Sequence, residues 1–337
     1  MSALAPPPLR VAFDSRAAGE PGGVGRYTGC LLEALKTLPA GGPDVVESHR
    51  PRRVDVFHSP SMEGALLRSP CPMVVTLHDL VPLKRPGEYL RTGLRFRLRY
   101  LAIQRADVVI VPTAAVARDA IEHLGLEPGR VAVIGEAAAP TMYPRSVPQV
   151  EKVRYRFGLP ERYLLWVGSM HHPQPRKRVA ELASTNRNLP LVLAGPTRQW
   201  ARELPDVLLT GRVSDEDLAS IYSGAHALVV PSDDEGFGLP PVESLACGTP
   251  VVACDVPAMR EVLGDRATFV EQGDYEGLMQ AAEDSVGPAP APPRWSWDDA
   301  ARATWRVYES VVAKKSPTSG SLAPMPKTVR MHPTTQT

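Results

Sequence analysis

A repeated alternation of short apolar runs with helical patterns constrains this chain more than any other feature. In the first half, the runs rich in Val, Ile and Leu lie at residues 9–13, 54–57, 74–77, 108–111 and 131–134. They are apolar throughout instead of alternating with polar residues, which is typical of parallel strands covered by helices on both faces. Helical patterns between them lie at about 24–38, 89–106 and 114–124. The first half therefore predicts a doubly wound α/β domain.

The same alternation restarts after residues 140–148, where prolines and a lack of apolar residues indicate a linker. Predicted strands follow at 163–167, 191–194, 207–209, 227–230 and 251–253, with helices at roughly 177–186, 214–224, 241–247 and 274–285. We therefore expect two Rossmann-like domains, at 1–148 and 149–290. We expect them to face each other across a cleft between the carboxyl ends of their strands, where α/β sheets bind ligands.

The end of the chain has a different composition. The proline-rich stretch 287–293 cannot be helical and indicates a stiff linker. It leads into the segment 294–314, an amphipathic helix from about residue 297 that we expect to pack back on the first domain. Residues 315–337 combine Ser, Pro, Thr and Lys with few apolar residues, so we expect a disordered tail.

Composition excludes several classes of protein. The 337 residues, 43% of them hydrophobic, suffice for two cores, and 38 Lys and Arg against 37 acidic residues argue against a nucleic-acid partner. The four cysteines lack metal-ligand spacing, no leader precedes the first strand, and no apolar run approaches the roughly 20 residues of a spanning helix. We therefore expect a cytoplasmic protein with free thiols, and any membrane contact to be peripheral, at the inner face of the membrane.

The most informative stretch is residues 231–250, Pro-Ser-Asp-Asp-Glu-Gly-Phe-Gly-Leu-Pro-Pro-Val-Glu-Ser-Leu-Ala-Cys-Gly-Thr-Pro. Gly236, Gly238 and the prolines prevent a helix over 235–240, and a proline at the first helical position fits a start near residue 240 or 241. A strand thus delivers a glycine-rich loop that opens directly into a short helix. Unpaired main-chain N–H groups beside the positive end of the helix dipole are typical of an anion site.

Two carboxylates accompany this anion site. Glu235 lies on the loop and Glu243 in the predicted first turn, so they would reach different parts of one ligand. A carboxylate beside a sugar accepts hydroxyl hydrogens, each charge-assisted bond contributing roughly 1.5–3 kcal/mol. A ligand whose phosphates bind the amides and whose hydroxyl groups bind the carboxylates would be a nucleotide sugar. For either glutamate alone, the alternative is that it merely complements the helix N-terminus.

These residues resemble the retaining glycosyltransferases of family 4 (GT4), which have the two-domain GT-B fold and two glutamates separated by seven residues. The resemblance extends over 22–27, 76–80 and 211–216. It implies transfer of a sugar from a nucleoside diphosphate to an acceptor hydroxyl, with retention of anomeric configuration. It further implies that Glu235 contacts the donor sugar and Glu243 the ribose. The other implied donor-binding residues of these stretches are Gly236, Phe237, Gly238, Leu239, Arg212 and Val213.

Three adjacent cations, Arg176, Lys177 and Arg178, follow the first predicted strand of the second domain. The resemblance implies that Lys177 contacts the diphosphate, assisted by Arg176 or Arg178. Fixed positive charge and helix amides can stabilise a departing nucleoside diphosphate, so we expect no metal and no cofactor. The alternative is a solvated basic loop.

The first domain contributes a glycine-rich turn and a histidine. Residues 22–25 superficially match a dinucleotide fingerprint but lack the acidic residue ~20 positions onward. By the resemblance, Gly23 and Gly25 let the backbone approach the donor phosphates and the acceptor, whereas the alternative is a bare turn. His78 follows the strand at 74–77, and the resemblance puts it near the transferred sugar. The expected catalytic residues are therefore His78, Lys177 and Glu235.

Acceptor and donor are less defined. The acceptor can be a glycan, a lipid-linked molecule or a small molecule, and the patterns at 76–80 and 175–177 most resemble mannosyltransferase-like members, which favours GDP-mannose. Cations interleaved with Leu, Tyr and Phe over 84–105 favour a solvated helix face, and the alternative is docking on an anionic membrane. Two other classes stay open, a nucleotide-sugar epimerase or hydrolase and an NAD-binding oxidoreductase.

Overall fold

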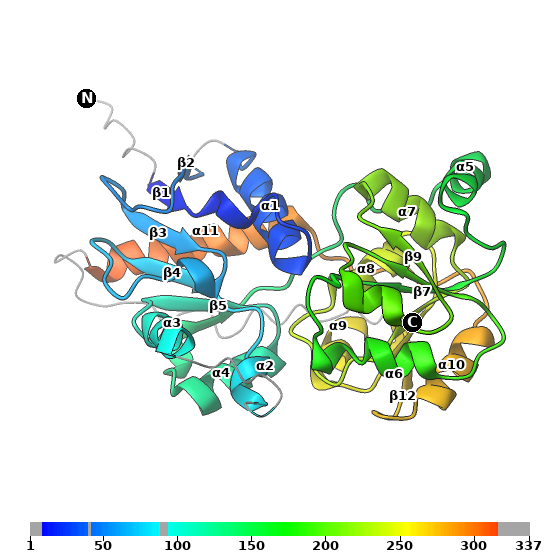
Figure 1. Ribbon diagram of the computed structural model, residues 1–337. Helices are drawn as coiled ribbons and strands as arrows, with labels where there is room; N and C mark the ends of the chain where they lie inside the picture. The colour runs from blue at the N-terminus through cyan, green and yellow to red at the C-terminus, as the bar shows by residue number, and fades with distance from the viewer. Residues whose placement is uncertain (1–8, 40–41, 86, 88–93, 316–337) are drawn as a thin grey trace. The chain divides into compact units, whose positions relative to one another are not determined.

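The computed structural model describes residues 9–39, 42–85, 87 and 94–315, which form two compact units (Figure 1). Unit 1 contains the described residues of Met1–Glu136 and Trp295–Thr337, and unit 2 is Ala137–Arg294. The chain therefore enters unit 2 earlier than the boundary at 148 that we expected. Apart from Lys315, the expected disordered tail at 315–337 lies outside the described residues, as do residues 89–93 of the expected helix at 89–106.

Unit 1 is built on a six-stranded parallel sheet in the order β2-β1-β3-β4-β5-β6. Its strands are β1 (Arg10–Phe13), β2 (Asp44–Glu47), β3 (Val56–Ser59), β4 (Met73–Thr76), β5 (Val108–Val111) and β6 (Val131–Val133). Its α-helices are α1 (Gly23–Lys36), α2 (Val81–Lys84), α3 (Leu94–Gln104), α4 (Ala114–Leu124) and α11 (Trp297–Lys315), with 3-10 turns η1 (Ser15–Ala17), η2 (Met62–Gly64) and η3 (Pro128–Arg130). Strands β3, β4 and β5 are buried along their whole length, as their apolar composition predicts.

Unit 2 repeats this plan with the order β12-β11-β10-β7-β8-β9. Its strands are β7 (Leu164–Val167), β8 (Leu191–Ala194), β9 (Val207–Gly211), β10 (Ala227–Val230), β11 (Val251–Cys254) and β12 (Thr268–Val270). Its helices are α5 (Val147–Phe157), α6 (Val179–Ser184), α7 (Asp215–Gly224), α8 (Leu239–Ala246), α9 (Pro257–Leu263) and α10 (Tyr275–Glu283), with η4 (Pro175–Lys177), η5 (Gln199–Glu203) and η6 (Gly264–Arg266). Two parallel α/β sheets confirm the predicted fold class.

Several elements were not predicted. The stretch 140–148, interpreted as a linker, contains the beginning of α5, where Ser146 and Gln149 form a capping box and Pro148 occupies the first turn. A proline is tolerated there because that amide has no intrahelical partner. The sequence prediction also lacked β2, α2, α9 and β12, which are short.

The sheet order creates a switch point in each unit. After β1 the chain adds β2 on one side and then β3 on the other, and after β7 it adds β8 and β9 on one side and then β10 on the other. The loops leaving neighbouring strands at such a point turn in opposite directions, which opens a crevice at the carboxyl ends of these strands. Ligand sites are therefore expected at the carboxyl ends of β1 and β3 in unit 1 and of β7 and β10 in unit 2.

Helix α11 packs against α1 in unit 1, and Figure 1 shows it in orange beside the blue α1. Trp297 at its beginning is 6% exposed and meets the ring of Tyr27, with ring centroids 5.7 Å apart. Further along, the Tyr308 hydroxyl lies 2.6 Å from His58 Nδ1. Buried aromatic side chains thus fix the last helix to the first domain's sheet. Within the described part of the chain, no helix combines the length and apolar character needed to cross a bilayer.

Candidate active site

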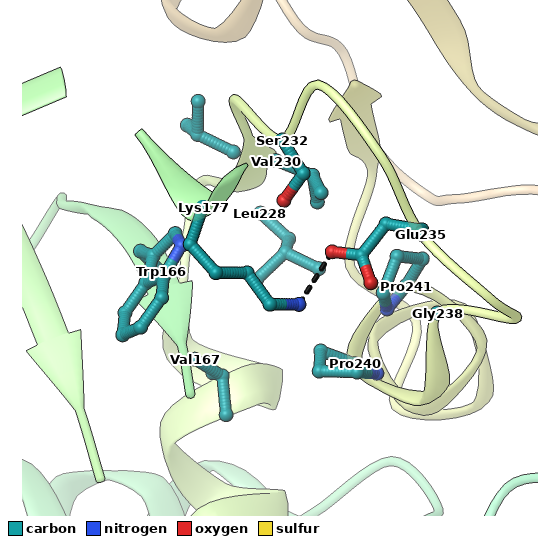
Figure 2. A pocket seen from close by; sticks show the side chains of 11 residues that line it. Trp166, Val167, Lys177, Leu228, Val230, Ser232, Glu235, Gly238, Pro240 and Pro241 are labelled. Atoms are coloured by element: carbon teal, nitrogen blue, oxygen red, sulfur yellow. Dashed lines mark hydrogen bonds and ion pairs between the residues drawn. The ribbon is translucent and has the colours of Figure 1, made fainter. Parts of the chain in front are cut away.

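The three adjacent cations lie at the switch point of unit 2, where each contacts a carboxylate on the loop after β10. Arg176 Nη1 lies 3.0 Å from Glu235 Oε2. Lys177 Nζ contacts the other oxygen of Glu235, as Figure 2 shows. Arg178, in the left-handed region at φ 47°, pairs with Asp233. The Asp233 amide also donates to the Arg176 carbonyl at 2.9 Å, so backbone and side chains join the two loops.

Glu235 is a buried carboxylate held ionised by its neighbours. It is 8% exposed. Burial alone would raise its pKa, but the charges of Lys177 and Arg176 outweigh burial and lower the pKa to about 2. The switch point therefore carries one negative and two positive side chains in direct contact at any physiological pH.

A small pocket lies at the carboxyl ends of β7 and β10, next to this ion pair. Trp166, Lys177, Glu235 and Gly238 are among its lining residues. Figure 2 shows the Lys177 side chain extending towards Glu235, with the prolines at the beginning of α8 close by. Lys177, the predicted cation, and Glu235, the predicted carboxylate, thus line the same pocket.

The turn before α8 requires glycine at position 238. Gly238 has φ 89°, and an added Cβ would lie 2.5 Å from the Met259 methyl group. The helix begins at Leu239, one residue before the range we expected. Because Pro240 and Pro241 carry no N–H, the amides without an intrahelical partner at this end belong to Gly238 and Leu239. The anion site therefore has fewer helix donors than an ordinary helix beginning.

Glu243 lies elsewhere than predicted. Because α8 begins at Leu239, Glu243 is in its second turn, and the expected place in the first turn was wrong. Its side chain is 2% exposed and accepts a hydrogen bond from the Tyr222 hydroxyl at 3.2 Å. Glu243 is not among the residues that line the pocket beside Lys177.

The other predicted donor-binding residues of unit 2 differ in exposure. Phe237 and Leu239 have buried side chains, so only their backbone is available to a ligand. Arg212 is exposed and Val213 half-buried, and both follow β9 at the edge of the sheet. Two strands, β7 and β8, separate β9 from β10. The structure thus brings Arg176, Lys177 and Glu235 together and leaves Arg212 on a more distant loop of the same sheet edge.

In unit 1, His78 follows β4 and has an unpredicted acidic partner. Its Nδ1 lies 3.1 Å from Glu136 Oε1, and its Nε2 lies 2.9 Å from the Pro60 carbonyl oxygen. Burial alone would lower the pKa of His78, but the hydrogen bond and charge of Glu136 outweigh burial and raise it. Glu136 follows β6, and no motif in the sequence marks it.

The packing of the fold alone accounts for the presence of His58 and Gly25. His58 is fully buried, with Nδ1 at 2.6 Å from the Tyr308 hydroxyl and Nε2 at 2.9 Å from Thr76 Oγ1, and burial lowers its pKa to about 3. It is therefore a neutral core histidine. A Cβ on Gly25 would lie 1.9 Å from the Glu20 carbonyl oxygen, so the turn itself requires this glycine. Gly23 is the first residue of α1. In the described residues, no three His, Cys, Asp or Glu side chains are grouped to hold a metal ion.

Comparison with known proteins covers both units. The family model described as Glycosyltransferase Family 4 matches residues 9–137, and the one described as Glycosyl transferases group 1 matches residues 161–286. Among curated relatives, O-antigen chain mannosyltransferase B of Escherichia coli is 26% identical over 269 residues, covering 70% of each chain. Serotype-specific mannosyltransferase WbdA of Escherichia coli is 25% identical over 245 residues. That match covers 64% of this chain but only 29% of WbdA, so the chain spans less than a third of that relative.

Solved structures share the fold at low sequence identity. Sucrose-phosphate synthase of Thermosynechococcus elongatus superposes with a TM-score of 0.64 at 17% identity, covering 91% of this chain and 97% of that one. HepE of Anabaena, in complex with UDP-glucose, gives 0.63 at 17% identity, covering 91% and 96%. With one family model on each unit, two parallel sheets, and Glu235 and Glu243 in the expected motif, this chain belongs to the family 4 glycosyltransferases and has the GT-B fold.

Proposed function

We propose that this protein transfers a sugar from a nucleoside diphosphate sugar to the hydroxyl group of an acceptor. The observation that carries the proposal is the contact of Lys177 and Arg176 with Glu235 at the switch point of unit 2. A site in which positively and negatively charged side chains touch suits a ligand that has both an anionic part and a part rich in hydroxyl groups. A nucleotide sugar has both.

In this proposal Lys177 and Arg176 bind the diphosphate, and the backbone of residues 236–239 assists them. Glu235 leaves the cations and accepts hydrogen bonds from the sugar hydroxyls. The fixed charges neutralise the diphosphate, so the transfer does not require a metal ion. Glu243 contacts the ribose after a shift that exposes its carboxylate, and Arg212 and Val213 contribute further donor contacts.

The transfer proceeds with retention and without a covalent enzyme intermediate. The bond between the anomeric carbon and the phosphate oxygen breaks, and its electron pair leaves with the diphosphate. The acceptor oxygen bonds to the anomeric carbon from the same face and gives its proton to the leaving phosphate, while His78 and Glu235 orient the sugar. NMR of the product tests this step, because an inverted anomer excludes the mechanism. Release of nucleotide without any acceptor would instead indicate a hydrolase.

The proposed donor sugar is mannose. The names of the relatives WbdA and O-antigen chain mannosyltransferase B favour mannose as the sugar, and the 76–80 and 175–177 patterns favour GDP-mannose, whereas the HepE structure holds UDP-glucose. A thermal-shift screen of nucleotide sugars tests the donor, because a ligand that binds only the folded state raises its melting temperature. GDP-mannose should give the largest shift, and Lys177→Ala should abolish it. No shift with any nucleotide sugar would refute the donor site.

The proposed acceptor is a glycan or a lipid-linked molecule reached at the inner face of a membrane. On α3, Leu98 and Leu101 are 40% and 45% exposed, and Arg97 on this helix and Arg105 directly after it are exposed as well. An outward face of leucines flanked by arginines favours peripheral contact with anionic lipids. Co-sedimentation with phosphatidylglycerol vesicles tests this contact. Leu98→Ser with Leu101→Ser should lower the bound fraction, whereas unchanged binding would contradict this use of α3.

A further inference from the structure

The surroundings of His78 fix the number of protons that its ring carries. A carbonyl oxygen only accepts hydrogen bonds, so the 2.9 Å contact with Pro60 requires a proton on Nε2 of His78. The 3.1 Å contact of Nδ1 with Glu136 then places either a second ring proton or a protonated carboxyl group between these atoms. In both arrangements, the pair holds one proton more than a neutral histidine and a free carboxylate would.

The burial of Glu136 favours a charged pair. Glu136 is 3% exposed, and a carboxylate at such a position is costly unless an opposite charge or several donors face it. His78 supplies that charge, and its own side chain is 18% exposed. The partly exposed ring thus presents the positive charge at the carboxyl edge of the sheet, while the carboxylate lies beneath.

We propose that Glu136 is a positioning residue that holds His78 as a doubly protonated, oriented imidazolium at the carboxyl edge of the unit 1 sheet. The inference rests on the proposed function, because positive charge there suits a donor with a diphosphate. His78 then acts as a fixed cation. With a proton on each nitrogen, it cannot serve as a general base.

The other groups around His78 do not compete for this role. Tyr27 from α1 meets the ring edge to face at 4.6 Å, and burial raises the pKa of Tyr27, so it stays neutral. From β3, His58 has its pKa lowered to about 3 by burial and, secondarily, by His78, so it carries no charge either. Asp79, the next residue along the chain, adds negative charge that favours the imidazolium. Glu136 and Asp79 are therefore the acidic groups that set the charge of His78.

The sign of the pH dependence follows from this arrangement. The partners raise the folded-state pKa of His78 above 6.5, its ordinary value. The pair therefore stabilises the fold fully below pH 6.5, and this contribution disappears as the pH rises through the folded-state pKa. An activity that needs the imidazolium should fall in the same range.

The test is a pH titration of the full-length protein labelled with ¹³C-histidine, following the ring Cε1 resonance of His78, which His78→Gln identifies by its loss. In the wild type, His78 should titrate above pH 6.5. In Glu136→Gln, its pKa should fall by at least one unit, a tenfold loss of proton affinity, and Glu136→Asp should restore part of the shift. Glu127→Gln, at an exposed position before β6, is the matched control and should change nothing.

Two outcomes would overturn the proposal: wild-type titration at or below pH 6.5, or an unchanged pKa in Glu136→Gln. The wild-type titration decides alone if the variant does not fold. The pH profile of kcat/KM supplies a readout that a merely structural role would not move, because its alkaline limb should shift to lower pH in Glu136→Gln. Thermal shifts with GDP-mannose separate the two claims. A thermal shift with GDP-mannose but an ordinary pKa of His78 refutes only the pairing with Glu136, whereas a raised pKa of His78 with no thermal shift by any nucleotide sugar refutes only the proposed function.

Discussion

Replacing Glu235 by glutamine should destabilise the protein in a pH-dependent way whose size follows from the site. The folded-state pKa of Glu235 is about 2, against an ordinary 4.5, because two cations contact the buried carboxylate. A difference of about 2.5 pKa units corresponds to roughly 3 kcal/mol of stability above pH 5. Because the folded-state pKa is lowered, this contribution is complete above the unfolded pKa and disappears as the pH falls towards 2.

Urea unfolding of the wild type and Glu235→Gln at pH 6 and pH 3, followed by circular dichroism, measures this effect. The stability difference between the two proteins should shrink by about 2 kcal/mol at pH 3, where the unfolded glutamate is mostly protonated and the folded one is not. Glu276→Gln, at an exposed position in α10, is the matched control. A wild-type advantage of the same size at both pH values would show that Lys177 and Arg176 do not hold Glu235 ionised, and the site would lose its electrostatic basis.

Three further results are expected. Lys177→Ala and Glu235→Ala should each lower kcat/KM at least about tenfold, or roughly 1.4 kcal/mol, in a nucleotide-release assay, and near-normal turnover of both would remove the site assignment. Excess EDTA should leave the rate unchanged, and a loss that Mg²⁺ restores would contradict a transfer that relies on fixed cations. Gly25→Ala should lower the melting temperature by several degrees or prevent folding, because its Cβ would meet the Glu20 carbonyl at 1.9 Å. Gly129→Ala is the control, because no atom lies within 4 Å of the new Cβ, and it should leave the melting temperature unchanged. An equal loss of melting temperature in both variants would refute the steric argument.

The fold was predictable where the sequence pattern has a single physical cause. Strands such as β5 are apolar on both faces because helices cover both faces of a parallel sheet. Strand β2 escaped prediction because it lies at the sheet edge with exposed charged ends and half-buried valines, so it lacks that pattern. Helix α5 escaped prediction because the prolines of residues 140–148 are typical of a linker and hide the Ser146 and Gln149 capping box.

The individual site residues of unit 2 were predictable, but their contacts were not. Residues 235–243 form a motif, and Lys177 belongs to a basic run after a strand, so both were found by type and spacing. Their ion pair joins positions 58 residues apart, because β10 returns beside β7 after β8 and β9 have been added on the other side. Glu136 was missed because no motif marks it and its partner is distant in sequence. It contacts His78 at the carboxyl edge of the unit 1 sheet, 58 residues away.

The ion pairs at the switch point also explain how a site for opposite charges can stay assembled before its ligand arrives. Half-buried cations and a buried carboxylate are each costly alone, but Lys177, Arg176 and Glu235 are desolvated together and compensate one another. In the proposed function, an incoming diphosphate takes the place of Glu235 on the two cations, and the released carboxylate receives the sugar hydroxyls. Each partner exchanges one charged or polar contact for another, so no buried charge is left alone while the donor is bound. A nucleoside diphosphate without its sugar would satisfy the cations but leave Glu235 without hydroxyl donors, which makes the carboxylate the part of the site that distinguishes the donor from the product.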